Sequence, residues 1–132
     1  MLTIVIIEKV MQTTKVMIIE DDKIIVSVAR WRLAKLGYEV CGSTGTGSEA
    51  MNMIECIRPD IILVDTNIKG KNDGIESARL IKEKYNIPVI LTSSDTDATT
   101  ISRARTINPD GFIRKPYQDD SLRVAIELGL KK

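Results

Sequence analysis

Two short aliphatic runs in this chain each end on acidic side chains. Ile61–Val64 is followed directly by Asp65, and Val16–Ile19 is followed by Glu20–Asp22. Short apolar runs bounded by polar residues are typical of buried strands in a parallel sheet. The carboxyl ends of such strands meet at one sheet edge, where open α/β folds bind ligands. Because converging carboxylates repel one another, we expect a cation between them, and oxygen ligands of this kind favour Mg²⁺.

A hydroxyl and a lysine stand at the ends of two further apolar runs. Thr92 follows Val89–Leu91, and Lys115 follows Gly111–Arg114. Together with the acidic residues they supply what phosphoryl transfer needs. Carboxylates can hold a metal or act as nucleophile, and an ammonium can bind a phosphoryl oxygen as a point charge. A hydroxyl that bonds the incoming group could report it to the neighbouring loop.

The composition fits one domain without a highly charged partner. The 132 residues are enough for one core and too few for two. The 19 basic and 18 acidic side chains nearly cancel, which argues against non-specific binding to nucleic acid or an anionic membrane. Histidine is absent, so any chemistry must use carboxylates, hydroxyls and lysine.

The two cysteines are interpreted as packing residues. Cys41 and Cys56 fall in a predicted strand and a predicted helix, and they lack the paired spacing of a zinc site. We expect both to be reduced packing residues of a cytosolic protein. No apolar run approaches the roughly 20 residues of a membrane span.

Strand-like and helix-like segments alternate five times from Lys15 onward, with a short second strand predicted at Tyr38–Cys41. Asp22 is expected to cap the first helix, which Gly37 ends. Repeated strand–helix units with right-handed crossovers predict an α/β fold with a doubly wound parallel sheet. Later helices are expected to begin at a capping box, Thr46–Glu49, and at a turn, Asn72–Gly74. The first helix is expected to turn inward Ile25, Val28, Ala29, Leu33 and Leu36.

Residues 1–14 form an extension ahead of the domain pattern, which occupies residues 15–132. Leu2–Ile7 is apolar but short and lacks a basic leader, so it is a poor signal peptide. Met11 could itself be a start codon. The extension is therefore either dispensable or an added edge strand or dimer contact, and the sequence leaves these alternatives open.

From about Lys15 to the C-terminus, the chain resembles a two-component response-regulator receiver domain. Five stretches carry the resemblance, and their order and spacing make it specific although each is weak alone. The resemblance implies a flavodoxin-like (βα)5 sheet with strand order 2-1-3-4-5. The matching stretches are Val16–Asp22, Asp60–Asp65, Asp73–Glu76, Ile87–Thr92 and Gly111–Pro116.

The resemblance also implies an acceptor and a metal site. Asp65 would accept a phosphoryl group from a histidine kinase. Asp21 would bind Mg²⁺ directly, and Glu20 would assist through water. The backbone carbonyl of Asn67 would complete the protein ligands, with Asp65 itself.

The switch residues follow from the same resemblance. Thr92 would be the switch hydroxyl, Phe112 the aromatic side chain that changes rotamer with it, and Lys115 the phosphoryl-binding lysine. The Lys115–Pro116 peptide bond is expected to be cis, a form largely confined to X–Pro bonds.

Two departures from the commonest family pattern are visible. Thr66–Lys71 follows the acceptor where a proline and a methionine are usual, which resembles a subtype with a longer Lys-Gly loop that is often attached to sensor kinases or stands alone. Ser93 stands after the switch hydroxyl where alanine is usual, and it is still small enough for phosphoryl access.

Three other functions stay open on the residues alone. Gly45–Ala50 has the G-x-G-x-x-A spacing of a dinucleotide site, although the strand before it is the second one and is short and polar. A haloacid-dehalogenase-like phosphatase also uses a strand-end aspartate, but such enzymes want a second aspartate where this chain has Asn67. A binding module could keep the fold without phosphorylation.

Trp31 lies between two arginines and off the apolar stripe of the first helix. An exposed tryptophan can be an interface anchor for the partner kinase. Its ring could equally lie flat on a neighbouring surface.

The function that we expect is a phosphorylation-dependent switch that catalyses only its own aspartyl phosphorylation and dephosphorylation. Its partner is a histidine kinase or phosphotransfer protein. Phosphorylation would shift an existing equilibrium at strands four and five and the helix near Ile101–Ile107, after the polar segment Asp95–Thr100. The chain ends soon after its last helix, so we expect that it either acts through protein contacts alone or is a piece of a larger regulator or kinase. We also expect a cytoplasmic location, without direct nucleic-acid or membrane binding. The kinase, the output partner, a homodimer and attachment to a larger protein stay open.

Overall fold

The computed structural model describes residues 13–68, 73–94 and 97–131. Several expectations fall outside these residues. They are the edge strand or dimer contact at the start of the chain, the longer loop at Lys69–Lys71, Asn72 in the predicted turn, and positions 95–96 of the polar segment.

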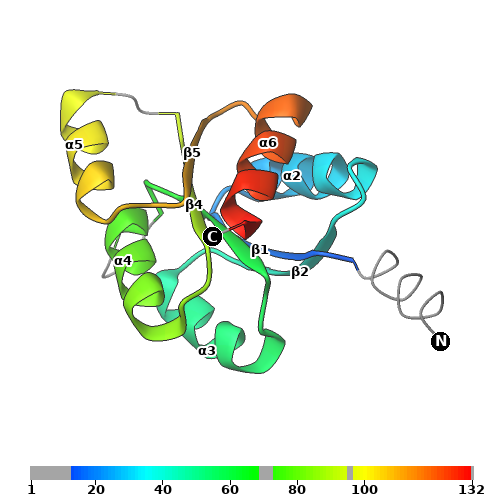
Figure 1. The fold of residues 1–132 in the computed structure, drawn as a ribbon, viewed down its shortest axis with the longest axis horizontal. Helices are drawn as coiled ribbons and strands as arrows, with labels where there is room; N and C mark the ends of the chain where they lie inside the picture. The colour runs from blue at the N-terminus through cyan, green and yellow to red at the C-terminus, as the bar shows by residue number, and fades with distance from the viewer. Residues whose placement is uncertain (1–12, 69–72, 95–96, 132) are drawn as a thin grey trace.

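The described residues form a parallel sheet of five strands in the order β2-β1-β3-β4-β5 (Figure 1). This confirms the doubly wound fold and the strand order that the resemblance implies. The sheet order reverses beside β1, so the ends of β1 and β3 meet at a topological switch point. The strands are β1 (Lys15–Ile19), β2 (Glu39–Thr44), β3 (Ile61–Asp65), β4 (Val89–Ser93) and β5 (Gly111–Arg114).

Five helices cover the two faces of the sheet. Helices α2 and α6 lie on one face, and α3 and α4 lie on the other, with α5 beside α4 (Figure 1). Alternate strand residues supply the two cores because strand side chains point to opposite faces. Met17 and Ile19 pack with α3 and α4, while Val16 and Ile18 pack with α2 and α6. The helices are α2 (Lys23–Lys35), α3 (Gly47–Ile57), α4 (Gly74–Tyr85), α5 (Ala98–Thr106) and α6 (Asp119–Leu130).

Acidic and hydroxyl side chains begin four of these helices. Asp22 accepts hydrogen bonds from the backbone N–H groups of Ile24 and Ile25, which confirms it as the cap of α2. Asp73 and Asp97 cap α4 and α5 in the same way. After α2, Gly37 adopts a φ of +91°, a left-handed conformation that glycine reaches without a steric penalty.

The predicted capping box of α3 forms only in part. Thr46 accepts from the Glu49 N–H at 3.3 Å as predicted. The Glu49 carboxylate does not return to the Thr46 N–H. It accepts instead from the Thr44 hydroxyl at 2.6 Å, and Thr44 in turn accepts from the Thr46 N–H at 3.5 Å. A side chain from the end of β2 therefore stands between the two halves of the box.

Three local predictions are wrong. The second strand runs on to Thr44 rather than ending at Cys41, because its residues pair with β1 as far as Ile19. Val28 is exposed, since α2 turns Ala29 and Leu33 inward instead. Cys56 is exposed on α3 and is not a packing residue, whereas Cys41 is half-buried against the α3 side of the core.

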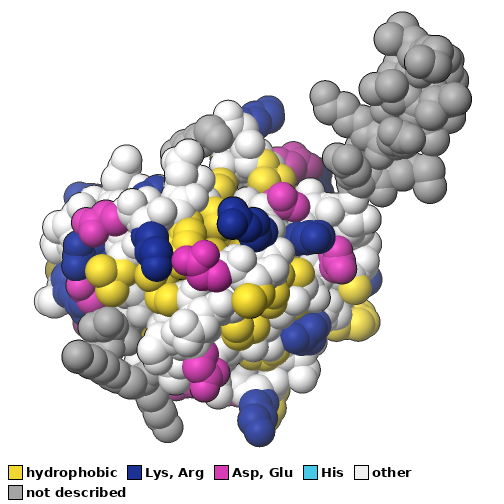
Figure 2. Space-filling view, turned by 90° about the horizontal axis from the view of Figure 1, so that it is seen from below, with side chains coloured by type: hydrophobic (Ala, Val, Ile, Leu, Met, Phe, Trp, Pro, Cys, Tyr) yellow, Lys and Arg dark blue, Asp and Glu magenta, His cyan; other side chains and the backbone are white. Residues whose placement is uncertain are grey.

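The surface carries charges of both signs. On the face that holds α3 and α4, acidic and basic side chains are interspersed (Figure 2). This mixture agrees with the near balance of charge in the sequence. Within the described ranges, no helix has the length and apolar character needed to cross a membrane.

Candidate functional site

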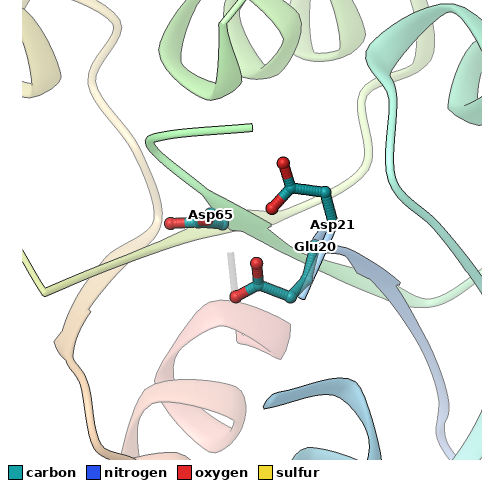
Figure 3. A group of neighbouring side chains, drawn as sticks. All are labelled: Glu20, Asp21 and Asp65. Carbon is teal, nitrogen blue, oxygen red and sulfur yellow. The ribbon is translucent and has the colours of Figure 1, made fainter. Parts of the chain in front are cut away.

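The carboxylates predicted to converge do lie together at the carboxyl edge of the sheet. Glu20 and Asp21 follow β1, and Asp65 is the last residue of β3. One carboxylate oxygen from each lies within 4.8 Å of the others (Figure 3). Glu20 and Asp65 are both 4% exposed, while Asp21 is half-buried. The parallel sheet thus places two buried negative charges and a third, more accessible one around a single point.

Lys115 reaches the same point from the end of β5. Its Nζ lies 2.8 Å from Glu20 Oε1 and 3.1 Å from Asp65 Oδ1. The lysine side chain is largely buried, so water screens these attractions weakly. The Lys115–Pro116 peptide bond is cis, as the resemblance implies.

The mutual contacts set the ionisation of these groups. Burial raises the pKa of Glu20, the bond from Lys115 lowers it, and the nearby Asp65 charge raises it again, so the Glu20 pKa lies above its ordinary value. Burial lowers the pKa of Lys115, but its bonds to Glu20 and Asp65 outweigh that effect and raise the pKa overall. Lys115 is therefore a permanent cation at neutral pH.

The backbone after β3 is held close to the Asp65 side chain. The Asn67 N–H donates to Asp65 Oδ1 at 3.3 Å, and the Asn67 side chain is exposed. Gly74 packs so tightly here that a Cβ would lie 1.7 Å from the Asp65 carbonyl oxygen. The first residue of α4 must therefore be glycine for the end of β3 to pass.

Hydroxyl groups line the β4 side of the site. Thr92 is buried and stands in register with Asp65 on the neighbouring strand. Ser93, also buried, accepts a 2.8 Å hydrogen bond from the Thr66 hydroxyl. Because Thr66 follows Asp65, this bond joins the ends of β3 and β4 directly beside the Asp65 carboxylate.

The aromatic residue beside Thr92 is not the one the sequence singles out. Phe112 is half-buried and packs with the α3 and α4 core. Tyr117, which the sequence analysis missed, is buried on the opposite face and donates to Thr92 Oγ1 at 3.5 Å. Its position two residues after Lys115, directly after the proline, is the signal that could have found it.

The donor set suits a hard divalent cation. Carboxylate oxygens are the ligands that Mg²⁺ prefers, and three of them converge here. Lys115 offsets one of the three negative charges, which leaves an excess for a cation to balance. The residues present therefore fit a magnesium ion, with Asp21 the most accessible ligand.

The family model described as the response regulator receiver domain matches residues 16–127. The chain belongs to this family. The match spans all five strands and the residues around Asp65, so it covers both the fold and the site.

Individual relatives agree with the family. The transcriptional regulatory protein PdtaR of Mycobacterium tuberculosis is 30% identical over 118 residues, which are 89% of this chain and 57% of that protein. The sensory transduction protein BceR of Halalkalibacterium halodurans is also 30% identical, over 89% of this chain and 50% of that protein. The chain thus spans about half the length of the curated relatives it matches.

A solved receiver domain is similar over nearly its whole length. The signal receiver domain of a modulated diguanylate cyclase from Desulfovibrio desulfuricans G20 is 36% identical, with a TM-score of 0.86. The likeness covers 91% of this chain and 95% of that one.

Family membership also bears on the rival functions. A phosphatase of the haloacid-dehalogenase kind belongs to another family, so that interpretation is wrong. The glycines of the dinucleotide-like stretch have a packing role: a Cβ on Gly47 would meet Ser77 Oγ of α4 at 2.1 Å. This close approach of α3 to α4 accounts for that glycine without a nucleotide.

Proposed function

We propose that this receiver domain is a phosphorylation-dependent switch in which Asp65 accepts a phosphoryl group from a histidine kinase or a phosphotransfer protein. The observation that carries the proposal is the convergence of Glu20, Asp21 and Lys115 on Asp65. An oxygen of Asp65 would form the new bond to phosphorus, and the donor would leave with the electrons of the bond that breaks. The location that we propose is the cytoplasm.

Each neighbour of the acceptor has a role in this step. Glu20 and Asp21, with Asp65 and the carbonyl of Asn67, would hold a magnesium ion. When bound, that ion supplies charge neutralisation for the phosphoryl oxygens. Lys115 is already within hydrogen-bond reach of Asp65, so its ammonium is placed to bind a phosphoryl oxygen there. Thr92, in register with Asp65, would donate a hydrogen bond from its hydroxyl to a second phosphoryl oxygen.

The proposal is tested with a small phosphodonor. After incubation with acetyl phosphate and MgCl₂, intact mass spectrometry should find one phosphoryl group per chain. With EDTA in place of MgCl₂, we expect formation to slow by about 100-fold, the usual size of a lost electrostatic contribution to a transition state. An adduct that forms equally fast in EDTA would contradict the metal site, and no adduct at all would contradict the acceptor.

We further infer that the phosphodonor docks on α2 beside the site. Three large apolar side chains, Ile24, Val28 and Trp31, are 76%, 40% and 59% exposed at helical spacing. The first two also line a groove of about 290 Å³ together with Pro116 and Lys115 of the site. An exposed apolar stripe that leads to the phosphoryl-binding lysine fits a partner helix that presents the donor group.

Trp31→Ala tests this docking surface. Lys35 Nζ lies 4.0 Å from the ring centroid, so the ring is held in one place on the surface. Loss of such an anchor should slow phosphotransfer by about five- to thirtyfold. The measurement uses a histidine kinase found to phosphorylate this chain in a phosphotransfer screen. Phosphorylation by acetyl phosphate should be unchanged.

Val124→Ala is the matched control for Trp31→Ala. Val124 is 47% exposed but lies on α6, outside the α2 stripe. The control should transfer at the wild-type rate. Equal rates for Trp31→Ala and wild type would exclude Trp31 from the docking surface.

The output surface that we propose includes β4, β5 and α5. Only Ala104 among the α5 residues is buried, so this helix has a small share of the core. An ion pair of 2.6 Å joins Arg103 of α5 to Asp73, the cap of α4. A lightly packed helix tied to the segment after the acceptor is suited to respond to phosphorylation.

A further inference from the structure

A buried pair of hydroxyl groups lies beside the acceptor, on the face of the sheet covered by α2 and α6. Tyr117 is 3% exposed and Thr92 is 1% exposed. The Tyr117 hydroxyl donates to Thr92 Oγ1 over 3.5 Å. A buried hydroxyl without a hydrogen-bond partner costs free energy, so the bond between these two groups stabilises the folded chain.

The direction of this bond decides what Thr92 can still do. A hydroxyl has one proton to donate and two lone pairs that accept. Because Tyr117 donates, it uses a lone pair of Thr92 and leaves the Thr92 proton for another acceptor. Asp65 stands directly across from Thr92 in the paired strands. A charged phosphoryl oxygen on Asp65 is a stronger acceptor than a neutral group.

We propose that Tyr117 is a positioning residue that holds Thr92 as a hydrogen-bond donor to the phosphoryl group on Asp65. This inference rests on the proposed function of Asp65. In a chain from Tyr117 through Thr92 to the phosphoryl group, each hydrogen bond polarises the next and strengthens it.

The surroundings keep Tyr117 a donor. Burial raises the pKa of its hydroxyl above the ordinary value, so the proton stays on Tyr117 at neutral pH. Phe112 cannot substitute because it has no hydroxyl and packs in the core on the other face. The two aromatic residues therefore lie on different sides of the sheet, and of these two only Tyr117 hydrogen-bonds the Thr92 hydroxyl.

The test removes one oxygen and keeps the ring. Wild type and Tyr117→Phe are titrated with beryllofluoride, a phosphoryl mimic, in MgCl₂, and binding is followed by fluorine NMR. We expect Tyr117→Phe to bind the mimic about two- to fivefold more weakly, the size of a modest hydrogen bond. The same substitution is then made in a Thr92→Val background, or in Thr92→Ala if the valine variant does not fold. There it should have no effect, since the bond is already lost.

Tyr38→Phe is the matched control. Tyr38 precedes β2, at the opposite end of the sheet, so its variant should bind beryllofluoride like wild type. Equal affinity of Tyr117→Phe and wild type would overturn the inference. So would an equal loss with and without the Thr92 hydroxyl, which would indicate altered packing. A wild-type chain that binds no beryllofluoride would overturn the proposed function as well, and this result is distinct from the other two.

Discussion

Asp65→Asn is expected to abolish the phosphoryl adduct that acetyl phosphate forms on the wild-type chain. An amide has no anionic oxygen to attack phosphorus, and it removes one of the three carboxylates around the site. The fold should persist, because asparagine has the shape of aspartate and its side-chain oxygen can still accept from the Asn67 N–H. Intact mass spectrometry gives the adduct, and a thermal melt verifies the fold.

Asp60→Asn is the matched control for this prediction. Asp60 directly precedes β3, at the other end of the strand that Asp65 completes, and its carboxylate accepts from the Lys15 N–H. The same chemical change there should leave phosphorylation at the wild-type level. An adduct that persists in Asp65→Asn would show that another residue accepts the group.

Gly74→Ala is expected to destabilise the domain by about 3 kcal/mol or more and to slow phosphorylation of whatever folds. The added Cβ would lie 1.7 Å from the Asp65 carbonyl oxygen and 2.9 Å from the Thr66 Cα. These neighbours are backbone atoms, so no side-chain rotation relieves the clash. Either α4 or the end of β3 must move, and the second movement displaces the acceptor. Urea unfolding and the acetyl phosphate assay measure the two effects.

Gly37→Ala separates this close approach from the general cost of replacing glycine. Gly37 has a positive φ, but a Cβ there would meet nothing within 4 Å. We expect a loss of about 1 kcal/mol from backbone strain and normal phosphorylation. If Gly74→Ala costs no more than Gly37→Ala, the backbone after β3 yields more easily than the packing indicates.

The sequence alone was enough to predict the site residues that lie at the carboxyl ends of the strands. Glu20, Asp21 and Asp65 follow runs of buried strand residues, and Lys115 follows the partly buried β5. A parallel sheet brings such strand ends to one edge. No long-range information was needed to group them. Cys56 could also have been placed correctly, because it lies off the helical stripe that contains Ile54 and Ile57.

Other features depend on packing that the sequence does not express. Helix α2 has apolar residues around much of its circumference, so the pattern alone could not show that Val28 faces outward while Ala29 faces the core. Tyr117 lies in a connection between β5 and α6, where no periodicity indicates burial. Its contact with Thr92 spans 25 residues and exists only once β4 and the connection are side by side.

The cluster around Asp65 has a consequence for the total charge of the site. Three acidic side chains and one lysine give the site a formal excess of two negative charges, which a single divalent cation would balance. Phosphorylation would replace the single charge of Asp65 with a phosphoryl group that carries nearly two, so the filled site would keep about one excess negative charge in a largely buried place. Uncompensated charge of that kind attracts neighbouring proton donors. With a divalent cation bound, the unphosphorylated site would be electrically neutral. The phosphorylated site would attract hydrogen-bond donors from the neighbouring segments of the chain.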